Sequence, residues 1–410
     1  MRLIRQDPET VRAALARRGP EAAASVERVL ELDRRWRAVT AELEELRAEQ
    51  NRASRGRRGA PTPEEREVLA TLAARGRSLS DEESSLKTQR DAELAAVPNL
   101  PASDAPDADL VLREVGEGGR LGRDHLELAG ERIDMERAAR VSGSRFAYLR
   151  GALVLVELAL VRFAFEKLSE EGFEPVIPPV LVRERALYGT GFLPDTEQQI
   201  YRLPDDDLYL VGTSEVALAS LHQDEILDGE RLPRRYAGFS SCFRREAGAA
   251  GKDTRGIFRV HQFDKVEMFC FVEPDRSGEE HERLLAIEES ILQELAIPYR
   301  VVAIAVNDLG ASAAKKYDCE AWLPGQGRYR ELTSCSNTTD FQARRLDIRY
   351  RPEEGRPAQL HTLNGTACAV GRTIIALLEN GQRDDGSVSL PASLVRYGAP
   401  ETLAPASAVR

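Results

Sequence analysis

The feature that most constrains the fold is a pair of long helical patterns, joined by a short segment near the N-terminus. In the first pattern apolar residues recur at alternating spacings of three and four, the repeat of a coiled-coil seam: Val29, Leu32, Trp36, Val39, Leu43 and Leu46. The second pattern, residues 64–96, has its own column, interrupted in the seam by Gly76 and Glu83: Leu69, Leu72, Leu79 and Leu86. The tip between them, residues 53–63, is rich in Gly, Pro and Arg. We therefore expect an antiparallel coiled-coil helical hairpin over residues 27–96, reaching about 45 Å.

A linker separates this hairpin from the rest of the chain. Residues 98–107 are polar, contain three prolines and show no apolar periodicity. Ahead of the hairpin, Asp7, Pro8 and Glu9 form a helix start with a capping side chain, a proline at the first position and an acid near the positive end of the dipole. We expect an N-terminal domain of residues 1–105 and a second domain of residues 106–410.

The second domain has the pattern of an α+β fold. Two helical segments, Gly151–Gly172 and Thr373–Gly381, flank several strand-like runs: Leu208–Val211, Phe239–Arg244, Phe258–Val272 and Arg328–Thr333. Strands that cluster between helices favour an antiparallel sheet. Neither a dinucleotide-binding nor a P-loop fingerprint occurs in the sequence.

Composition restricts the class of protein and the cellular location that we expect for the chain. A net charge of −11 with 42% hydrophobic and 30% charged residues is typical of a soluble globular protein. The longest apolar run, residues 152–161, is interrupted by Glu157 and is too short to span a membrane. The N-terminus has no apolar signal segment, and the five cysteines show no C-x-x-C spacing. We expect a cytoplasmic protein with no zinc site and no membrane partner.

Residues 242–267 hold the densest group of chemically active side chains. Because alternate residues of a strand share a face, Arg244 should point with Glu246. The same alternation groups Arg259, His261, Phe263, Lys265 and Glu267, and a Gly-rich loop carries Lys252 and Arg255. A fixed arginine, a basic loop and an aromatic face could hold a nucleoside triphosphate. The alternative is a solvated hairpin with ion pairs on one face, and for His261 a packing role is equally compatible with the pattern.

These residues resemble a known enzyme family. Phe243-Arg244-Arg245-Glu246 is similar to motif 2 of the class II aminoacyl-tRNA synthetases, and residues 172–179 resemble motif 1, the dimer-forming helix and strand. Three further segments resemble the bacterial-type seryl-tRNA synthetases: Thr213-Ser214-Glu215, residues 331–337 and residues 363–372. The resemblance covers essentially the whole chain. It implies a class II catalytic domain on an antiparallel sheet, a homodimer, and transfer of serine to tRNA.

The resemblance also implies a role for each matching residue. Serine binding is implied for Thr213, Ser214, Glu215, Arg244, Glu267, Asn364 and Thr366. ATP binding is implied for Arg244, Arg245, Glu246, Val260, Phe263, Glu331, Leu332, Thr333, Ser334 and Arg372. Catalytic roles are implied for Arg244, Glu267 and Arg372, and Mg²⁺ binding for Glu331 and Ser334, whose oxygens suit that ion. No general base is expected, because attack of a carboxylate on phosphorus needs charge neutralisation and alignment.

The tip of the hairpin carries a cluster of cations: Arg52, Arg55, Arg57 and Arg58. Such a cluster on an acidic chain predicts salt-dependent contacts with a nucleic-acid backbone. The resemblance implies that the hairpin binds the long variable arm of tRNA(Ser), and of tRNA(Sec) as well. The alternative is a coiled coil that serves only dimerisation.

Other functions are compatible with part of this pattern. A related ligase could load serine onto a carrier protein, although such relatives generally lack the arm. A tRNA-binding or regulatory paralogue would not need the ATP and Mg²⁺ positions that this chain retains. A duplicate enzyme for natural-product assembly or antibiotic resistance would use the same residues, so the sequence leaves that alternative open.

Overall fold

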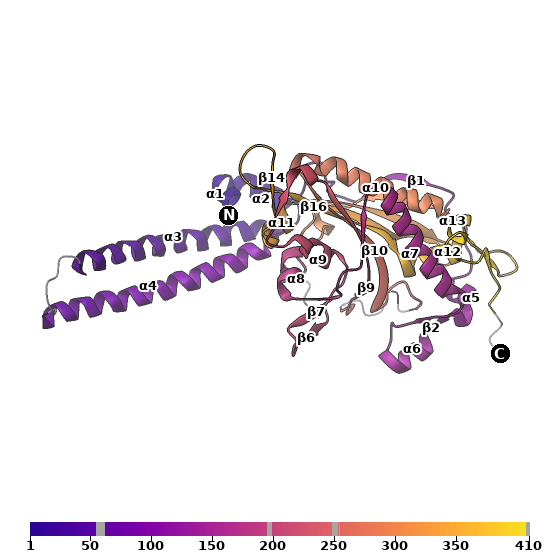
Figure 1. The fold of residues 1–410 in the computed structure, drawn as a ribbon, viewed down its shortest axis with the longest axis horizontal. Helices are drawn as coiled ribbons and strands as arrows, with labels where there is room; N and C mark the ends of the chain where they lie inside the picture. Colours follow the sequence, from indigo (N-terminus) through magenta and orange to yellow (C-terminus); the bar gives the residue numbers. More distant parts are fainter. Residues whose placement is uncertain (55–61, 195–198, 248–252, 254, 407–410) are drawn as a thin grey trace. The chain divides into compact units, whose positions relative to one another are not determined.

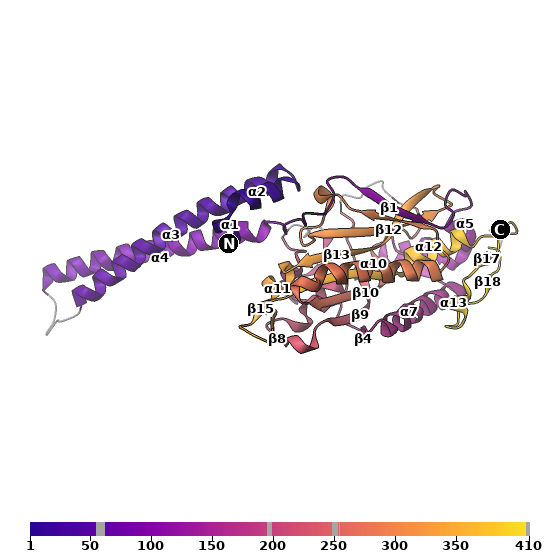
Figure 2. The same cartoon turned by 90° about the horizontal axis from the view of Figure 1, so that it is seen from above.

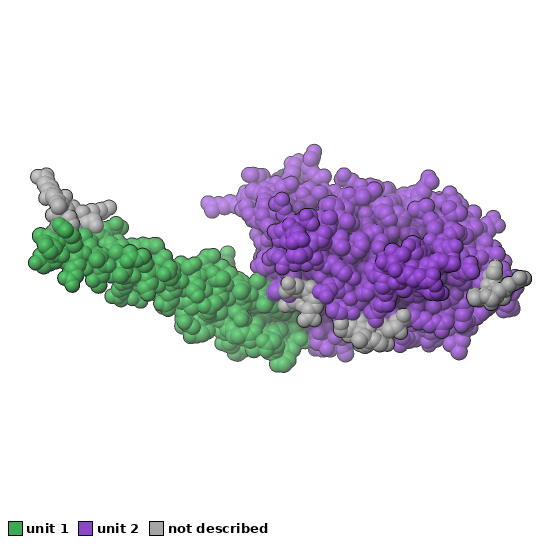
Figure 3. Space-filling view, turned by 90° about the horizontal axis from the view of Figure 1, so that it is seen from below, with its two compact units in different colours: residues 1–100 green, residues 101–410 purple. Residues whose placement is uncertain are grey.

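The computed structural model describes residues 1–54, 62–194, 199–247, 253 and 255–406. The chain divides into two compact units, residues 1–100 and residues 101–410 (Figure 3). Within the described ranges, no helix is long and apolar enough to cross a membrane.

Helices make up the described part of the first unit: α1 (Arg2–Gln6), α2 (Pro8–Ala16), α3 (Pro20–Ser54) and α4 (Pro63–Ala96). Helices α3 and α4 lie side by side as the predicted antiparallel hairpin (Figure 1). The carboxylate of Asp7 accepts a hydrogen bond from the backbone N–H of Thr10 at 3.2 Å, which caps α2 as expected. Thr62 and Glu65 form a reciprocal capping box that starts α4.

The hairpin seam is built largely from the predicted residues. Buried side chains in it include Val29, Leu43, Leu46, Leu79 and Leu86. Glu83 and Gly76, which interrupt the second apolar column, both face residues of α3. Glu83 accepts a hydrogen bond from Trp36 Nε1 at 2.6 Å, and the lack of a side chain at Gly76 leaves room for Leu46 and Gln50.

A buried carboxylate, which the apolar repeat did not predict, lies in the same unit. Asp33 is 1% exposed, and its oxygens lie 2.6 Å from Arg5, 3.1 Å from Arg37 and 3.6 Å from Arg90. Burial alone would raise the pKa of Asp33, but the guanidiniums, Arg5 foremost, hold it below its ordinary value. The guanidinium of Arg90 also lies over the Trp36 ring at 4.2 Å. Asp33 therefore ties α1, α3 and α4 together.

The second unit is organised around an eight-stranded sheet. Its strand order is β1-β11-β12-β13-β16-β10-β9-β4, antiparallel except for the β4–β9 pair. The strands are β1 (Leu110–Val115), β11 (Tyr299–Ala303), β12 (Lys315–Leu323), β13 (Arg328–Thr339), β16 (His361–Ala369), β10 (Gln262–Val272), β9 (Arg234–Phe243) and β4 (Glu174–Val176). This confirms the predicted α+β fold with an antiparallel sheet.

Smaller elements surround this sheet. The α-helices are α5 (His125–Ala129), α6 (Met135–Ser142), α7 (Ala152–Glu170), α8 (Glu184–Thr190), α9 (Glu215–Ala219), α10 (Ser277–Glu294), α11 (Phe341–Leu346), α12 (Val370–Asn380) and α13 (Ala392–Val395). The short strands are β2 (Ile133–Asp134), β3 (Tyr148–Leu149), β5 (Leu181–Val182), β6 (Arg202–Leu203), β7 (Leu208–Leu210), β8 (Ile226–Asp228), β14 (Arg349–Arg351), β15 (Ala358–Gln359), β17 (Val388–Ser389) and β18 (Thr402–Leu403).

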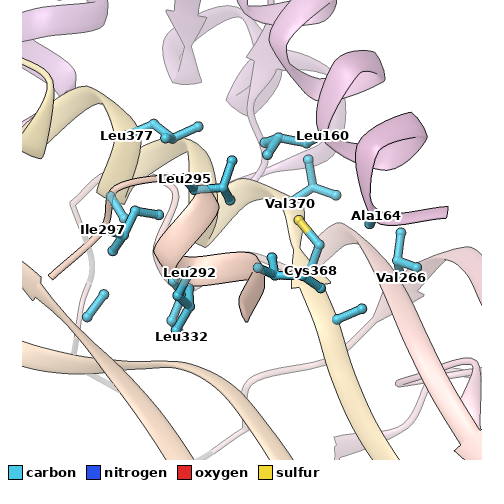
Figure 4. Packing of buried hydrophobic residues seen from close by; sticks show 14 of the residues in the cluster. Leu160, Ala164, Val266, Leu292, Leu295, Ile297, Leu332, Cys368, Val370 and Leu377 are labelled. Atoms are coloured by element: carbon cyan, nitrogen blue, oxygen red, sulfur yellow. The ribbon is translucent and has the colours of Figure 1, made fainter. Parts of the chain in front are cut away.

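The two faces of the large sheet have different partners. Helices α7, α10 and α12 pack on one face, where Val266 belongs to the main core with Leu160 and Leu292 (Figure 4). Figure 2 shows α10 beside β13 and β10, and α10 contacts these two strands and β16. On β10 the alternate residues Phe269 and Phe271 belong to a separate core with α9 and α11. This second face of β10 is the one that carries the site described below.

One predicted strand begins later than expected. The strand predicted from Phe258 starts at Gln262, so Arg259 and His261 precede β10 and do not share in its alternation. The predicted grouping is wrong for these two residues. It is correct for Phe263, Lys265 and Glu267, which lie on one face of β10.

We expect that Asp33→Ala lowers the free energy of unfolding of the first unit by about 2–4 kcal/mol, because it leaves Arg90 without this carboxylate in a poorly hydrated position. Urea denaturation of the full chain, followed by circular dichroism, measures the effect. Glu42→Ala is the control, since it breaks an exposed ion pair with Arg75 at 2.5 Å in the same hairpin and should cost less than about 1 kcal/mol. Equal losses in the two variants would contradict a stabilising role for Asp33.

Candidate active site

A cavity of about 210 Å³ opens on the face of the sheet opposite α7 and α10. Ten predicted ATP- and serine-site residues line it: Arg244, Glu246, Val260, Phe263, Glu331, Leu332, Thr333, Ser334, Thr366 and Arg372. The remaining lining residues are Ile257, Phe258, Arg259, Lys265, Ala369 and Gly371. The lining therefore comes from β10, β13, β16, the start of α12 and the segments that follow β9 and precede β10.

A β-bulge in β13 brings two of the predicted residues to the same face. Glu331 and Ser334 are three positions apart, so a regular strand would point them to opposite faces. The register shifts at this point, with Ser334 opposite Asp318 and Glu331 opposite Glu320. The extra residue, Leu332, restores a common direction, so that both oxygen donors line the cavity.

Arg244 follows directly after β9 and is held by several contacts. Its Nε donates to the carbonyl oxygen of Gly212 at 3.2 Å, and its guanidinium carbon lies 5.3 Å from the centre of the Phe263 ring. The backbone of Arg244 exchanges two hydrogen bonds with His261, from Arg244 N–H to the His261 carbonyl and from His261 Nδ1 to the Arg244 carbonyl, both at 2.9 Å. His261 thus contacts the backbone of Arg244 and is absent from the cavity lining.

Beside the cavity lies a buried polar cluster that contains the predicted serine-binding residues. Glu267 forms an ion pair with Lys265, and Thr213 donates a hydrogen bond to Glu267 at 3.4 Å. Glu215 accepts hydrogen bonds from Gln342 and Asn364, both at 2.8 Å. Two further members complete the cluster: Thr366, which pairs opposite Glu267 across β10 and β16, and Ser214, whose buried hydroxyl has no hydrogen-bond partner among the described residues.

The carboxyl groups differ in protonation because their surroundings differ. Burial, together with the charge of Glu267, raises the pKa of Glu215 to about 7. Burial also raises the pKa of Glu267, against the opposing charges of Lys265 and Arg244. For Glu331, burial is outweighed by the cations Arg372 and Lys316, which hold its pKa below the ordinary value. Glu331 is therefore ionised at neutral pH.

Arginines and one aromatic ring form the opposite part of the cavity. Arg372 donates to the backbone carbonyl of Glu331 at 3.0 Å, and its guanidinium lies 4.6 Å from the Phe258 ring centre. Arg330 lies 3.8 Å from the centre of the same ring. Arg259 pairs with Glu246 at 2.6 Å. These contacts hold several cations around the cavity. Such an arrangement suits a polyanionic ligand.

Several site residues were not predicted from the sequence. Lys265 and Arg259 belonged to the predicted strand face, and their charge was the signal that could have added them. Phe258 and Gln342 carried no such signal, because their positions depend on the loop before β10 and on α11. Gln342 contacts Glu215 from 127 residues away in the chain.

Some predicted residues do not gather at this cavity. The side chain of Arg245 is exposed, does not line the cavity, and its backbone N–H donates to Gln199. Arg255, in the predicted basic loop, pairs with Asp124 at 3.1 Å. Arg52 is exposed near the end of α3, whereas Arg55, Arg57, Arg58 and the loop residue Lys252 lie outside the described residues.

The donors in the cavity suit one type of metal ion. Glu331 and Ser334 offer hard oxygen atoms on a common face, and Glu331 is ionised. Among the described residues, no group of three or more His, Cys, Asp or Glu side chains could hold a metal ion. Magnesium fits this arrangement, since it is usually bound by one or two carboxylates together with substrate phosphates.

Comparisons with known proteins agree with this arrangement. Residues 199–381 match the family model described as the tRNA synthetase class II core domain (G, H, P, S and T), and residues 1–101 match the seryl-tRNA synthetase N-terminal domain. The chain is 51% identical to the serine–tRNA ligase of Thermobifida fusca, with 99% of this chain and 98% of that protein covered.

Two solved structures are also similar. The seryl-tRNA synthetase of Pyrococcus horikoshii, complexed with ATP, has a TM-score of 0.91 and 42% identity, with 99% of both chains covered. The cytoplasmic serine–tRNA ligase of Naegleria fowleri, in complex with AMP, has a TM-score of 0.84 and 32% identity, with 98% of this chain and 96% of that chain covered. The chain therefore belongs to the seryl-tRNA synthetase family of class II aminoacyl-tRNA synthetases, as its sequence motifs predicted.

Proposed function

We propose that this chain is an ATP-dependent serine–tRNA ligase that forms seryl-adenylate and transfers serine to the 3′-terminal adenosine of tRNA(Ser). The observation that carries the proposal is the position of Arg244, which lines the cavity beside the buried carboxyls Glu215 and Glu267 and whose charge opposes the rise that burial causes in their pKa. Activation brings a carboxylate against the α-phosphate, so two anions must approach each other. A fixed guanidinium between their binding regions reduces that repulsion and aligns the reactants.

The buried polar cluster is suited to serine. We assign the serine ammonium to Glu215 and Glu267, with Thr213 orienting Glu267, and the serine carboxylate to Arg244. Ser214 and Asn364 complete the wall of this pocket. Thr366, with Glu267, is the candidate for the hydroxyl of serine, because alanine would leave these buried polar groups unpaired. Exclusion of threonine by pocket size alone is weaker, about 1–3 kcal/mol.

The cavity is suited to ATP and Mg²⁺. We assign the α-phosphate to Arg244, the adenine to Phe263 and to the backbone at Val260, and the γ-phosphate and the outer face of the adenine to Arg372. Glu246, Leu332, Thr333 and Arg245 complete the ATP contacts. Glu331 and Ser334 would hold Mg²⁺, which neutralises phosphate charge when bound. The similar structures with ATP and AMP support a nucleotide in this cavity.

The hairpin is assigned to tRNA. Arg52, Arg55, Arg57 and Arg58 would contact the backbone of the long variable arm of tRNA(Ser), and of tRNA(Sec). The match of residues 1–101 to the seryl-tRNA synthetase N-terminal domain supports this assignment. The carrier-protein alternative is disfavoured, because the serine–tRNA ligases similar to this chain are matched along almost their whole length, hairpin included.

A homodimer is the proposed assembly. Helix α7 and the segment after β4 expose large apolar side chains, including Leu158, which is 61% exposed, and Ile177, which is 82% exposed. Exposed apolar side chains grouped on a surface are typical of protein interfaces.

A cytoplasmic location is proposed from the cysteines, all five of which are free and buried.

Replacing Arg244 with alanine tests the central assignment. We expect serine-dependent pyrophosphate exchange to fall at least about 1000-fold in kcat/KM, because one charge-stabilising donor is typically worth a factor of this order. Arg113→Ala is the matched control: it removes an arginine that pairs with Glu289 at the β1 edge, and activity should stay within twofold. Full exchange in a folded Arg244→Ala variant would contradict the proposal.

The protonation of Glu215 predicts a pH dependence of serine binding. Its pKa is raised to about 7, so the ionised form that pairs with an ammonium is lost as the pH falls through that value. We expect the KM for serine to rise about tenfold from pH 8 to pH 6. Glu215 and Glu267 interact, so the measured pKa belongs to the pair. Glu215→Gln should flatten this profile, whereas an unchanged profile in that variant would exclude Glu215 as the titrating group.

Substitution of all four tip arginines by alanine tests the hairpin assignment. Loss of these phosphate contacts should lower kcat/KM for tRNA charging by about 100-fold at physiological salt, and pyrophosphate exchange should be unchanged. The control variant removes four exposed arginines of the second unit: Arg113, Arg276, Arg344 and Arg396. Equal loss of charging in both variants would indicate a net-charge effect and would contradict a specific tRNA contact.

A further inference from the structure

Glu288 is a buried acid that the proposed chemistry does not use. It lies on α10, on the face of the sheet opposite the cavity, and it is 0% exposed. None of the ion pairs among the described residues includes it. Lys316 interacts electrostatically with Glu288, but its ammonium pairs with Asp318 at 2.8 Å.

The carboxyl of Glu288 contacts two strands at once. Oε1 accepts a hydrogen bond from the backbone N–H of Thr366, on β16, at 3.1 Å. Oε2 lies at hydrogen-bond distance, 2.8 Å, from the hydroxyl of Thr333 on β13. Thr366 stands opposite Glu267 at the serine side, and Thr333 lines the cavity at the nucleotide side. The side chain of Glu288 therefore connects the serine side and the nucleotide side of the site from the opposite face of the sheet.

The glycine at position 365 makes this contact possible. A Cβ at Gly365 would lie 3.1 Å from Glu288 Oε1 and 3.0 Å from Met268 Cε. Contacts this short would push the carboxyl away from Thr366. Because residue 365 carries no side chain, the backbone of β16 approaches Glu288 without such a shift.

We propose that Glu288 is a positioning residue that fixes the spacing between Thr366 and Thr333, and thereby couples serine recognition to nucleotide binding across β13 and β16. This inference rests on the proposed function, because the roles of Thr366 and Thr333 are those assigned there. Glu288 touches neither substrate in this account. It acts through the backbone of Thr366 and the hydroxyl of Thr333.

The chemistry of the contact specifies which substitutions should preserve it. Burial raises the pKa of Glu288 well above its ordinary value. The amide of Thr366 donates to Oε1 of Glu288, and the hydroxyl of Thr333 donates to Oε2. Glutamine has the same shape: its oxygen can accept from the Thr366 amide, and its amide nitrogen can donate to the Thr333 hydroxyl, which accepts as well as donates.

The test compares Glu288→Gln with Glu288→Ala in the full-length protein, by pyrophosphate exchange with serine and with threonine. Glu288→Gln should retain kcat/KM for serine within about threefold. Glu288→Ala should raise the KM for serine about tenfold, and should reduce the preference for serine over threonine by a similar factor. Glu289→Ala is the control, because it removes a neighbouring acid of α10 that contacts Arg113 and Tyr299, away from the cavity. It should lower stability without changing the preference.

A third variant keeps the inference testable if Glu288→Ala does not fold. Glu288→Asp keeps the acid but shortens its reach, so serine preference should fall below that of Glu288→Gln. An active Asp variant with an inactive Gln variant would show that the negative charge matters, and would overturn the inference. Wild-type preference in a folded Glu288→Ala protein would overturn it as well. Absence of serine-dependent exchange in the wild-type protein would instead refute the proposed function.

Discussion

The balance between buried carboxyls and the cations that face them determines what this site can bind. Glu215 and Glu267 lie together out of water, where two like charges are costly. Lys265 pairs with Glu267, and the guanidinium of Arg244 acts on both carboxyls from the side of the cavity. The site therefore presents negative groups at one end and cations at the other. A substrate with an ammonium and a carboxylate on one carbon, placed against a nucleotide phosphate, matches that order of charges.

The antiparallel sheet makes this balance of carboxyls and cations possible, because one of its faces packs in the core and the other carries the site. Side chains on one face of β10 pack against α7 and α10 in the main core, and alternate side chains point to the site. The bulge in β13 turns Glu331 and Ser334 in one direction, so that the phosphate end of the cavity gains two oxygen donors. Glu288 contacts Thr333 and Thr366 from the packed face of the sheet.

Sequence reasoning predicted the features that depend on short-range patterns. The cap at Asp7, the hairpin and the alternation from Phe263 to Glu267 follow from neighbouring residues. It failed where contacts between distant residues determine the structure. The bulge at Leu332 has no local marker, and residues 258–260, which were predicted as part of the strand from Phe258, line the cavity ahead of β10. Asp33 breaks the apolar pattern of its helix, and only the three-dimensional placement of three arginines explains it. The site motifs were recognised as a set through their resemblance to a family, and the polar contact from Gln342 required the fold.

The most direct measurement of the central claim is a crystal structure of this protein with a non-hydrolysable seryl-adenylate analogue, such as a seryl-sulfamoyl adenosine. The account predicts the adenine at Phe263, the guanidinium of Arg244 within hydrogen-bond distance of the sulfamoyl oxygens or the seryl carbonyl, and the ammonium between Glu215 and Glu267. An analogue bound in the cavity with its ammonium away from both carboxyls, or with Arg244 turned toward solvent, would contradict the account.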